Sequence, residues 1–147
     1  MDRIGKTEYY LDIAEAVGKR STCERRMYGA VLVQNDEIIS TGYNGAPRGD
    51  ANCSDLGDCK REAMNVPKGE RYELCVAVHA EMNCMISASR RDMLGATLYI
   101  IGKEKKEDRY ASSEPCLLCQ KLIKNAGIKK IIGRNPEGEI VEYNIWK

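Results

Sequence analysis

Two short motifs in this sequence contain residue types that can bind a metal ion and move protons. The first is His79-Ala80-Glu81, and the second is Pro115-Cys116-Leu117-Leu118-Cys119. Histidine and cysteine are ligands that zinc prefers, and three protein ligands leave a fourth position for water, as in catalytic zinc sites. Because bound zinc lowers the pKa of water to about 7, the pattern predicts an activated hydroxide at neutral pH.

Glu81 lies two residues after His79 and is the predicted proton carrier for that water. Both motifs are predicted to open helices, whose positive N-terminal ends favour the thiolate forms of Cys116 and Cys119. Residues two apart in a regular helix point about 200° apart. His79 and Glu81 can therefore share a target only if it lies beyond the end of the helix.

Each motif alone is a weak signal, because Cys-x-x-Cys also occurs in redox pairs and zinc knuckles. His79 is the only histidine of the chain, and a lone histidine is most often an ordinary polar residue. The two motifs together are typical of zinc-dependent nucleobase deaminases. Two alternatives stay open: a deaminase of another small aminated base or nucleoside, and a non-catalytic zinc-stabilised binding module. Glu81 argues against the module, because a structural metal needs no proton carrier.

The elements that must position these motifs follow from hydrophobic periodicity and turn residues. The predicted helices cover residues 7–19, 80–89 and 115–126, with Ser113 as the cap of the last one. The predicted strands cover residues 30–33, 38–43, 97–101, 129–132 and 139–143. This order predicts a three-layer α/β/α fold with a mixed central sheet of about five strands, in a single domain of residues 1–147. A charged loop is expected at residues 102–113.

Composition restricts the classes of partner. The net charge of +1 makes binding to a polynucleotide unexpected, and no apolar run is long enough for a transmembrane helix. No secretory signal is recognised, and seven cysteines are an odd number for a disulfide framework. We therefore expect a cytoplasmic protein that binds no membrane and uses its cysteines as metal ligands or buried thiols.

Three segments carry a resemblance to the cytidine/deoxycytidylate deaminase superfamily, and within it to the deoxycytidylate (dCMP) deaminase branch. They are Ser21-Thr22-Cys23-Glu24-Arg25 leading to Gly29-Ala30-Val31, Gly42-Tyr43-Asn44-Gly45-Ala46-Pro47-Arg48-Gly49, and Val78-His79-Ala80-Glu81-Met82-Asn83. The resemblance extends from residue 21 to residue 132. It implies the α/β/α fold, a small nucleotide substrate, and hydrolysis of dCMP to dUMP and ammonia.

The resemblance also implies roles for single residues. Glu81 would carry protons to N3 of cytosine and to the departing amine. The N–H of Ala80 would meet the base O2, and the carbonyl of Glu114 would receive the amine. Asn44 would hold the sugar hydroxyl, and Arg25 is the candidate for the phosphate because guanidinium matches phosphate geometry. Family members of this kind are homo-oligomers, often hexamers, with dCTP as activator and dTTP as inhibitor, and effector contacts are expected at residues 44–49.

The remaining cysteines suggest a second metal. An aperiodic insertion at residues 44–75 is long for a compact domain, and Cys23, Cys53, Cys59 and Cys75 lie in it or flank it. Four thiolates make a closed structural zinc site, and some relatives carry such a zinc. The alternative is scattered buried thiols, which is our interpretation for Cys84.

Several residues depart from the family pattern or have a plain interpretation. Tyr28 stands where the family has a smaller aliphatic residue, and the stretch from 102 to 114 is longer than is typical. Arg26 is interpreted as a solvated charge, as is the mixed-charge run at residues 103–109. Arg48 is expected to contact an effector, a neighbouring subunit or nothing.

Overall fold

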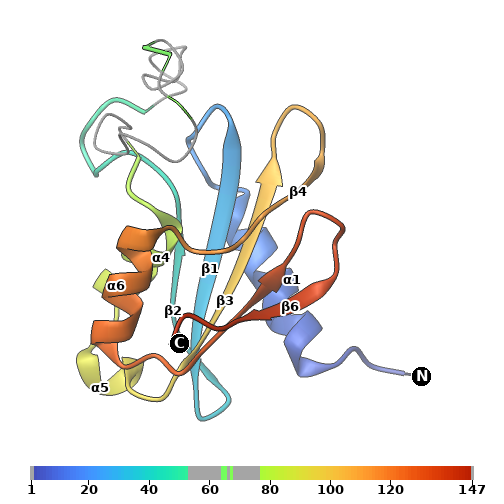
Figure 1. The fold of residues 1–147 in the computed structure, drawn as a ribbon, viewed down its shortest axis with the longest axis vertical. Helices are drawn as coiled ribbons and strands as arrows, with labels where there is room; N and C mark the ends of the chain where they lie inside the picture. Colours follow the sequence, from blue (N-terminus) through green and yellow to red (C-terminus); the bar gives the residue numbers. More distant parts are fainter. Residues whose placement is uncertain (1, 53–63, 66, 68–76, 147) are drawn as a thin grey trace.

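The computed structural model describes residues 2–52, 64–65, 67 and 77–146. Its helices are α1 (Lys6–Gly18), α4 (Ala80–Ile86), α5 (Arg90–Met93) and α6 (Leu117–Ala126). Its strands are β1 (Arg26–Gln34), β2 (Glu37–Tyr43), β3 (Thr97–Glu104), β4 (Arg109–Ala111), β5 (Lys130–Arg134) and β6 (Ile140–Tyr143) (Figure 1).

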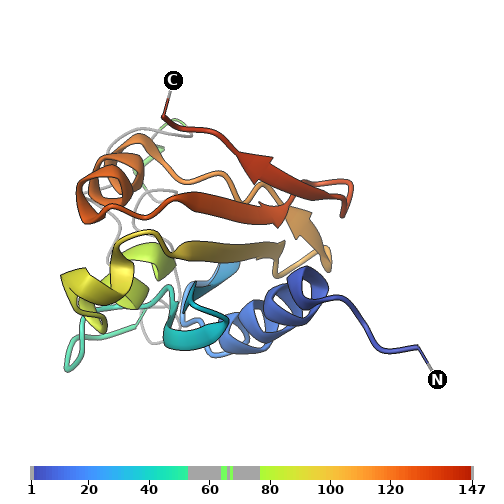
Figure 2. The ribbon, with the colours of Figure 1, turned by 90° about the horizontal axis from the view of Figure 1, so that it is seen from below.

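The strands form one mixed sheet in the order β2-β1-β3-β5-β6, with β4 paired to the far end of β3. Among the strands that the structure describes, only the β3–β5 pair is parallel, because α6 carries the chain back across the sheet between them. The helices cover both faces, and Figure 2 shows α1 on the opposite side of the sheet from α4, α5 and α6. The predicted three-layer α/β/α fold with a mixed sheet is confirmed.

The two faces of the sheet follow from alternation along the central strands. Val31, Val33, Tyr99 and Ile101 pack with Leu11 and Ala14 of α1. Their neighbours on the other face, Ala30, Leu32, Leu98 and Ile100, pack with Ala80, Cys84, Cys119 and Ile123 of α4 and α6. Two metal-site helices therefore rest on one continuous apolar surface, which fixes them relative to each other.

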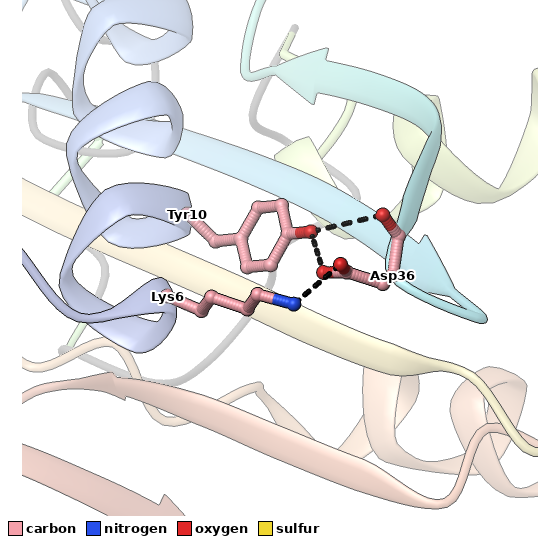
Figure 3. A network of polar contacts seen from close by, with 3 residues as sticks. All are labelled: Lys6, Tyr10 and Asp36. Carbon is pink, nitrogen blue, oxygen red and sulfur yellow. Dashed lines mark hydrogen bonds and ion pairs between the residues drawn. The ribbon is translucent and has the colours of Figure 1, made fainter.

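A network of polar contacts joins α1 to the hairpin between β1 and β2 (Figure 3). The hairpin turns at Asn35 and Asp36, which both have positive φ (52° and 61°), as a tight two-residue connection requires. The Tyr10 hydroxyl donates to Asp36 Oδ1 at 2.6 Å, and Lys6 Nζ pairs with the same carboxylate. These contacts lower the pKa of Asp36, and the hydrogen bond together with burial raises the pKa of Tyr10 to about 12.

Several predicted boundaries were wrong, among them those of the second helix, the charged loop and the cap of α6. The helix expected at residues 80–89 ends at Ile86, and the short helix α5 follows it. The charged loop expected at 102–113 is a hairpin, because β3 continues to Glu104 and pairs with β4. Ser113 does not cap α6: it is buried and donates to the carbonyl of Arg134 at 2.8 Å, so the cap of α6 is Cys116.

In the described part of the chain, no helix combines the length and the apolar character needed to cross a membrane.

Candidate active site

His79 lies just outside the helix that its motif opens. It is the N-cap of α4, with extended backbone (φ −69°, ψ 151°), and Glu81 is the second residue of the helix. A bridge between Gly45 and Val78, with N–H···O distances of 3.1 and 2.6 Å, ties this corner to the end of β2. Because His79 has left the helical path, its side chain and that of Glu81 reach the same cavity.

Cys116 and Cys119 stand at the start of α6, as their motif predicts. Cys116 is the N-cap, and its Sγ accepts a hydrogen bond from the Cys119 N–H at 3.4 Å. The Nε2 of Gln120 donates to the carbonyl of Pro115, the residue before Cys116, at 2.8 Å, and this hydrogen bond stabilises the start of the helix. The helix ends at Gly127 in the left-handed conformation (φ 81°), as expected.

The structure brings His79, Cys116 and Cys119 together from two helices. Their ligand atoms all lie within 4.8 Å of one another, with His79 Nδ1 3.3 Å from Cys119 Sγ and 3.6 Å from Cys116 Sγ. Zinc bonds of about 2.0–2.3 Å in a tetrahedron separate a nitrogen from a sulfur ligand by about 3.5 Å. The nitrogen, the two sulfurs and their spacing therefore fit a shared zinc ion.

The electrostatics of the cluster favour a cation. The hydrogen bond from Cys119, followed by the one from His79, lowers the pKa of the Cys116 thiol to about 4. The pKa of Cys119 is raised because its proton is shared with that thiolate and because it is buried. One thiolate is thus already present at neutral pH, where an incoming metal ion can meet it.

Glu81 is the buried carboxyl beside this cluster, with 7% of its surface exposed. Burial raises its pKa, while the nearby His79 opposes the shift. A raised pKa makes a carboxylate a better proton acceptor, as proton transfer from water requires. Its burial beside the cluster makes Glu81 the candidate general acid–base of the site.

A cavity of about 480 Å³ opens above the cluster. The four residues with predicted substrate contacts all line it: Asn44, Arg25, Ala80 and Glu114. Asn44 is buried and already tied to β1, because its Oδ1 accepts from the Tyr28 N–H at 2.8 Å and its Nδ2 donates to the Arg26 carbonyl at 3.0 Å. The amide retains one further donor and one further acceptor site for a ligand.

Sequence reasoning missed part of the cavity wall. Arg26 is not a solvated charge: only 24% of its side chain is exposed, and Nε pairs with Glu104 Oε1 at 2.8 Å. Tyr28, Glu104, Arg109 and Tyr110 also line the cavity, and the last two come from β4. The residues on both sides of 105–108 show no regular alternation of polar and apolar types, so the sequence held no periodic signal for this hairpin.

Of the five other cysteines, the structure describes Cys23 and Cys84. Cys84 is fully buried in α4, its pKa is raised to about 11 by burial, and it contacts Ser40, so the prediction of a core thiol is confirmed. Cys23 is buried and borders the cavity. Cys53, Cys59 and Cys75 lie outside the described residues, so the second zinc site stays a prediction.

Comparison with known proteins agrees with this chemistry. The family described as the cytidine and deoxycytidylate deaminase zinc-binding region matches residues 4–134. The deoxycytidylate deaminase of Mycobacterium phage D29 is 41% identical over 137 residues, which are 90% of this chain and 96% of the phage protein. The deoxycytidylate deaminase of Schizosaccharomyces pombe is 35% identical over 84% of this chain, which spans only 35% of that relative.

Solved structures give the same result. The dCMP deaminase of cyanophage S-TIM5 in its apo form has a TM-score of 0.63 at 28% identity, covering 91% of this chain and 86% of the phage chain. The same enzyme in complex with dCMP and dUMP has a TM-score of 0.62 at 27% identity, covering 92% and 85%. Since the family match includes both metal-binding motifs and most of the sheet, this chain belongs to the cytidine and deoxycytidylate deaminase family.

Proposed function

We propose that this protein hydrolyses dCMP to dUMP and ammonia, with one zinc ion held by His79, Cys116 and Cys119. The observation that carries the proposal is the cavity, in which Glu81 and the His-Cys-Cys cluster share a wall with arginine side chains. The names of the phage and fungal relatives, and the dCMP and dUMP in the cyanophage complex, support this substrate.

The chemistry divides between the metal and the protein. When bound, zinc would supply a water molecule whose pKa is lowered to about 7. The Glu81 carboxylate accepts a proton from the attacking water and delivers it to N3 of cytosine. It then transfers the second water proton to the amino group on C4, which leaves as ammonia. Burial suits Glu81 to this exchange because it raises the pKa of the carboxyl.

Other cavity residues would orient the nucleotide. The N–H of Ala80 lies at the first turn of α4 and would donate to O2 of the base. The Glu114 carbonyl would accept from the exocyclic amine, the Asn44 amide would hold the sugar hydroxyl, and Arg25 would bind the phosphate. Each of these residues lines the cavity, which supports its proposed contact.

Parallel assays test the substrate. Ammonia release from dCMP, CMP, deoxycytidine and cytidine should give the highest kcat/KM for dCMP. Removing zinc with a chelator should abolish the activity, and adding zinc back should restore it. Equal or faster turnover of the free nucleosides would refute the assignment to nucleotides, and the absence of ammonia from all four would refute the proposed function.

Further features of the family extend the proposal. We propose assembly into a homo-oligomer, most simply a hexamer, and control by dCTP and dTTP at residues 44–49. We also propose a second zinc ion, bound by Cys23, Cys53, Cys59 and Cys75. Oligomer formation is supported by exposed apolar side chains on α4 and α6, since Ile86 and Leu117 are 77% and 76% exposed. Light scattering should show an oligomer.

We also expect the protein to act in the cytoplasm.

A further inference from the structure

The short segment of residues 112–115 connects β4 to the N-cap of α6 and carries one group of the proposed active site. This group is the carbonyl of Glu114, the proposed acceptor for the exocyclic amine, and Ser113 and Glu114 both line the cavity. The segment belongs to no helix or strand, so no regular backbone ladder fixes the direction of the Glu114 carbonyl. Contacts on either side of this carbonyl therefore decide where it points.

The side of the segment that enters α6 is held by local contacts. Gln120 Nε2 donates to the Pro115 carbonyl at 2.8 Å. The hydroxyl of Ser112, which is exposed, accepts from the Glu114 N–H at 3.3 Å. Both contacts are made within the segment and the start of α6, so neither of them attaches Glu114 to the sheet.

Ser113 makes the attachment to the sheet. Its side chain is buried, and its Oγ donates to the Arg134 carbonyl at 2.8 Å and lies 3.0 Å from the Tyr143 hydroxyl. A serine hydroxyl has one hydrogen, and a carbonyl can only accept. The Tyr143 hydroxyl is therefore the donor in the second bond. Through these two bonds Ser113 ties the segment to both β5 and β6.

The sheet leaves room for this side chain at a glycine of β5. A Cβ at Gly133 would collide with Ser113 Oγ and would lie 2.8 Å from the Ile100 carbonyl oxygen. Tyr143 packs against the apolar core cluster that contains Ile131 and Cys119, so the core holds the ring from which the hydroxyl donates. The contact at Ser113 is thus formed by segments that lie far apart in the sequence.

We propose that Ser113, held by Tyr143 and by the Arg134 carbonyl, is a positioning residue that directs the Glu114 carbonyl toward the substrate amine. Ser113 precedes Glu114 directly, so its anchor fixes one side of that residue while the Pro115 contact fixes the other. The inference rests on the proposed function, because it takes the Glu114 carbonyl to accept the amine. It gives β6, which contributes no metal ligand, a role in the reaction.

A purely structural hydrogen bond between the segment and the sheet is the competing explanation. It predicts that loss of the Ser113 hydroxyl lowers Tm without changing kcat/KM, or weakens the binding of every nucleotide alike. Positioning of the Glu114 carbonyl predicts instead that only ligands with an amine at C4 are affected. dUMP carries an oxygen at C4 and offers that carbonyl no N–H, so comparison of dCMP with dUMP separates the two.

The test uses Ser113→Ala in the full-length zinc-loaded protein. Since one hydrogen bond to the amine loses its direction, kcat/KM for dCMP should fall about 10-fold. Zinc content and the affinity for dUMP, measured by calorimetry, should be unchanged. The matched control is Ser89→Ala, which removes a serine hydrogen bond to the Asp92 N–H at the start of α5. It should lower Tm and leave kcat/KM unchanged. An unchanged kcat/KM in Ser113→Ala, or an equal loss of dUMP affinity, would overturn the proposal.

Tyr143→Phe provides a milder second variant. Ser113 keeps its bond to the Arg134 carbonyl there, so kcat/KM for dCMP should fall by a smaller factor. Added to Ser113→Ala, the same change should cause no further loss, because its acceptor is already absent. Losses that multiply in the double variant would contradict the proposed route. If the unsubstituted protein fails to deaminate dCMP, the proposed function is wrong. If it deaminates dCMP and Ser113→Ala does so equally well, only the role of Ser113 is wrong.

Discussion

At the scale of single residues, the candidate site works because neighbouring backbone conformations differ. His79 is extended and Glu81 is helical, so side chains two residues apart in sequence reach one cavity. A continuous helix through both residues would have separated them by about 200°. The burial of Glu81 adds the second requirement, because it raises the pKa of the carboxyl.

Glu81→Gln should retain the fold and the metal while losing most turnover. The amide has nearly the shape of the carboxyl but cannot accept and return a proton. Loss of general acid–base catalysis costs about 10²–10⁴-fold, and we expect the upper end because Glu81 serves several transfers. The check is kcat together with zinc content and Tm. Glu142→Gln, an exposed change on β6, is the control. Near-normal kcat in zinc-loaded Glu81→Gln would remove Glu81 from the mechanism.

At the scale of elements, the position of the site depends on how closely helices approach the sheet. α4 crosses β2 at Gly42, where a Cβ would lie 2.4 Å from the Cys84 nitrogen and 2.5 Å from the Ala80 carbonyl oxygen. Asn83 Nδ2 adds a hydrogen bond to the Tyr43 carbonyl at 2.8 Å. The helix that carries His79 and Glu81 is thus held by backbone contact as well as by apolar packing.

Gly42→Ala should displace α4 and with it the metal site. The atoms that a Cβ would meet belong to the helix backbone, which cannot rotate away, so we expect a cost of about 1–3 kcal/mol in the free energy of unfolding. Zinc affinity and kcat should fall together with Tm. Gly5→Ala is the control, because no atom lies within 4 Å of a Cβ there. Full zinc binding with unchanged Tm in Gly42→Ala would contradict this account of how α4 is positioned.

Tyr10→Phe should loosen the contact between α1 and the β1–β2 hairpin. The lost hydrogen bond is worth about 1 kcal/mol at neutral pH, and Tyr9→Phe, at the exposed neighbour, should cost less. The pKa of Tyr10 is raised, so its contribution is present below pH 10 and is lost as the pH rises through about 12. The pKa of Asp36 is lowered, so its contribution is present above about pH 4 and is lost in more acidic solution.

Thermal unfolding from pH 2 to pH 12 measures this dependence. The difference in Tm between the unsubstituted protein and Tyr10→Phe should be largest between about pH 4 and pH 10 and should shrink on both sides. A difference that is constant across the whole range would show that Tyr10 contributes through packing alone.

At the scale of the whole molecule, the proposed second zinc would join the insertion to the cavity through Cys23. This thiol is buried and borders the cavity, while its proposed partners Cys53, Cys59 and Cys75 lie outside the described residues. A structural zinc on the four thiolates would connect the end of α1 to the chain that approaches His79. It would therefore stabilise the active site as well as the insertion.

The number of zinc ions per chain tests whether this second zinc is bound. The protein should carry two zinc ions per chain, and Cys59→Ser should carry one. Because structural zinc contributes on the order of 10 kcal/mol of folding free energy in small domains, Tm should fall sharply. Cys84→Ala removes a core thiol instead and should keep both ions. One zinc per chain in fully active unsubstituted protein would exclude the second site.

The sequence by itself determined the layers and the reactive groups. The apolar run at residues 30–33 predicted the strand that became β1, and the motifs around His79 and Cys116 predicted both helix starts. These features are local, because a few neighbouring residues define both the hydrophobic period and the spacing of the ligands. The family resemblance added the expected substrate contacts of Ala80, Glu114, Asn44 and Arg25, which local patterns do not contain.

Only the tertiary structure decided what else surrounds the cavity. Arg26 looked like a surface charge because its partner Glu104 is 78 residues away, and only the register of β1 on β3 brings them together. The hairpin that carries Arg109 was missed because β4 has only three residues and follows a charged turn, so its pairing with β3 rather than periodicity defines it. Strand register depends on the whole sheet, and for that reason it could not be obtained from either segment alone.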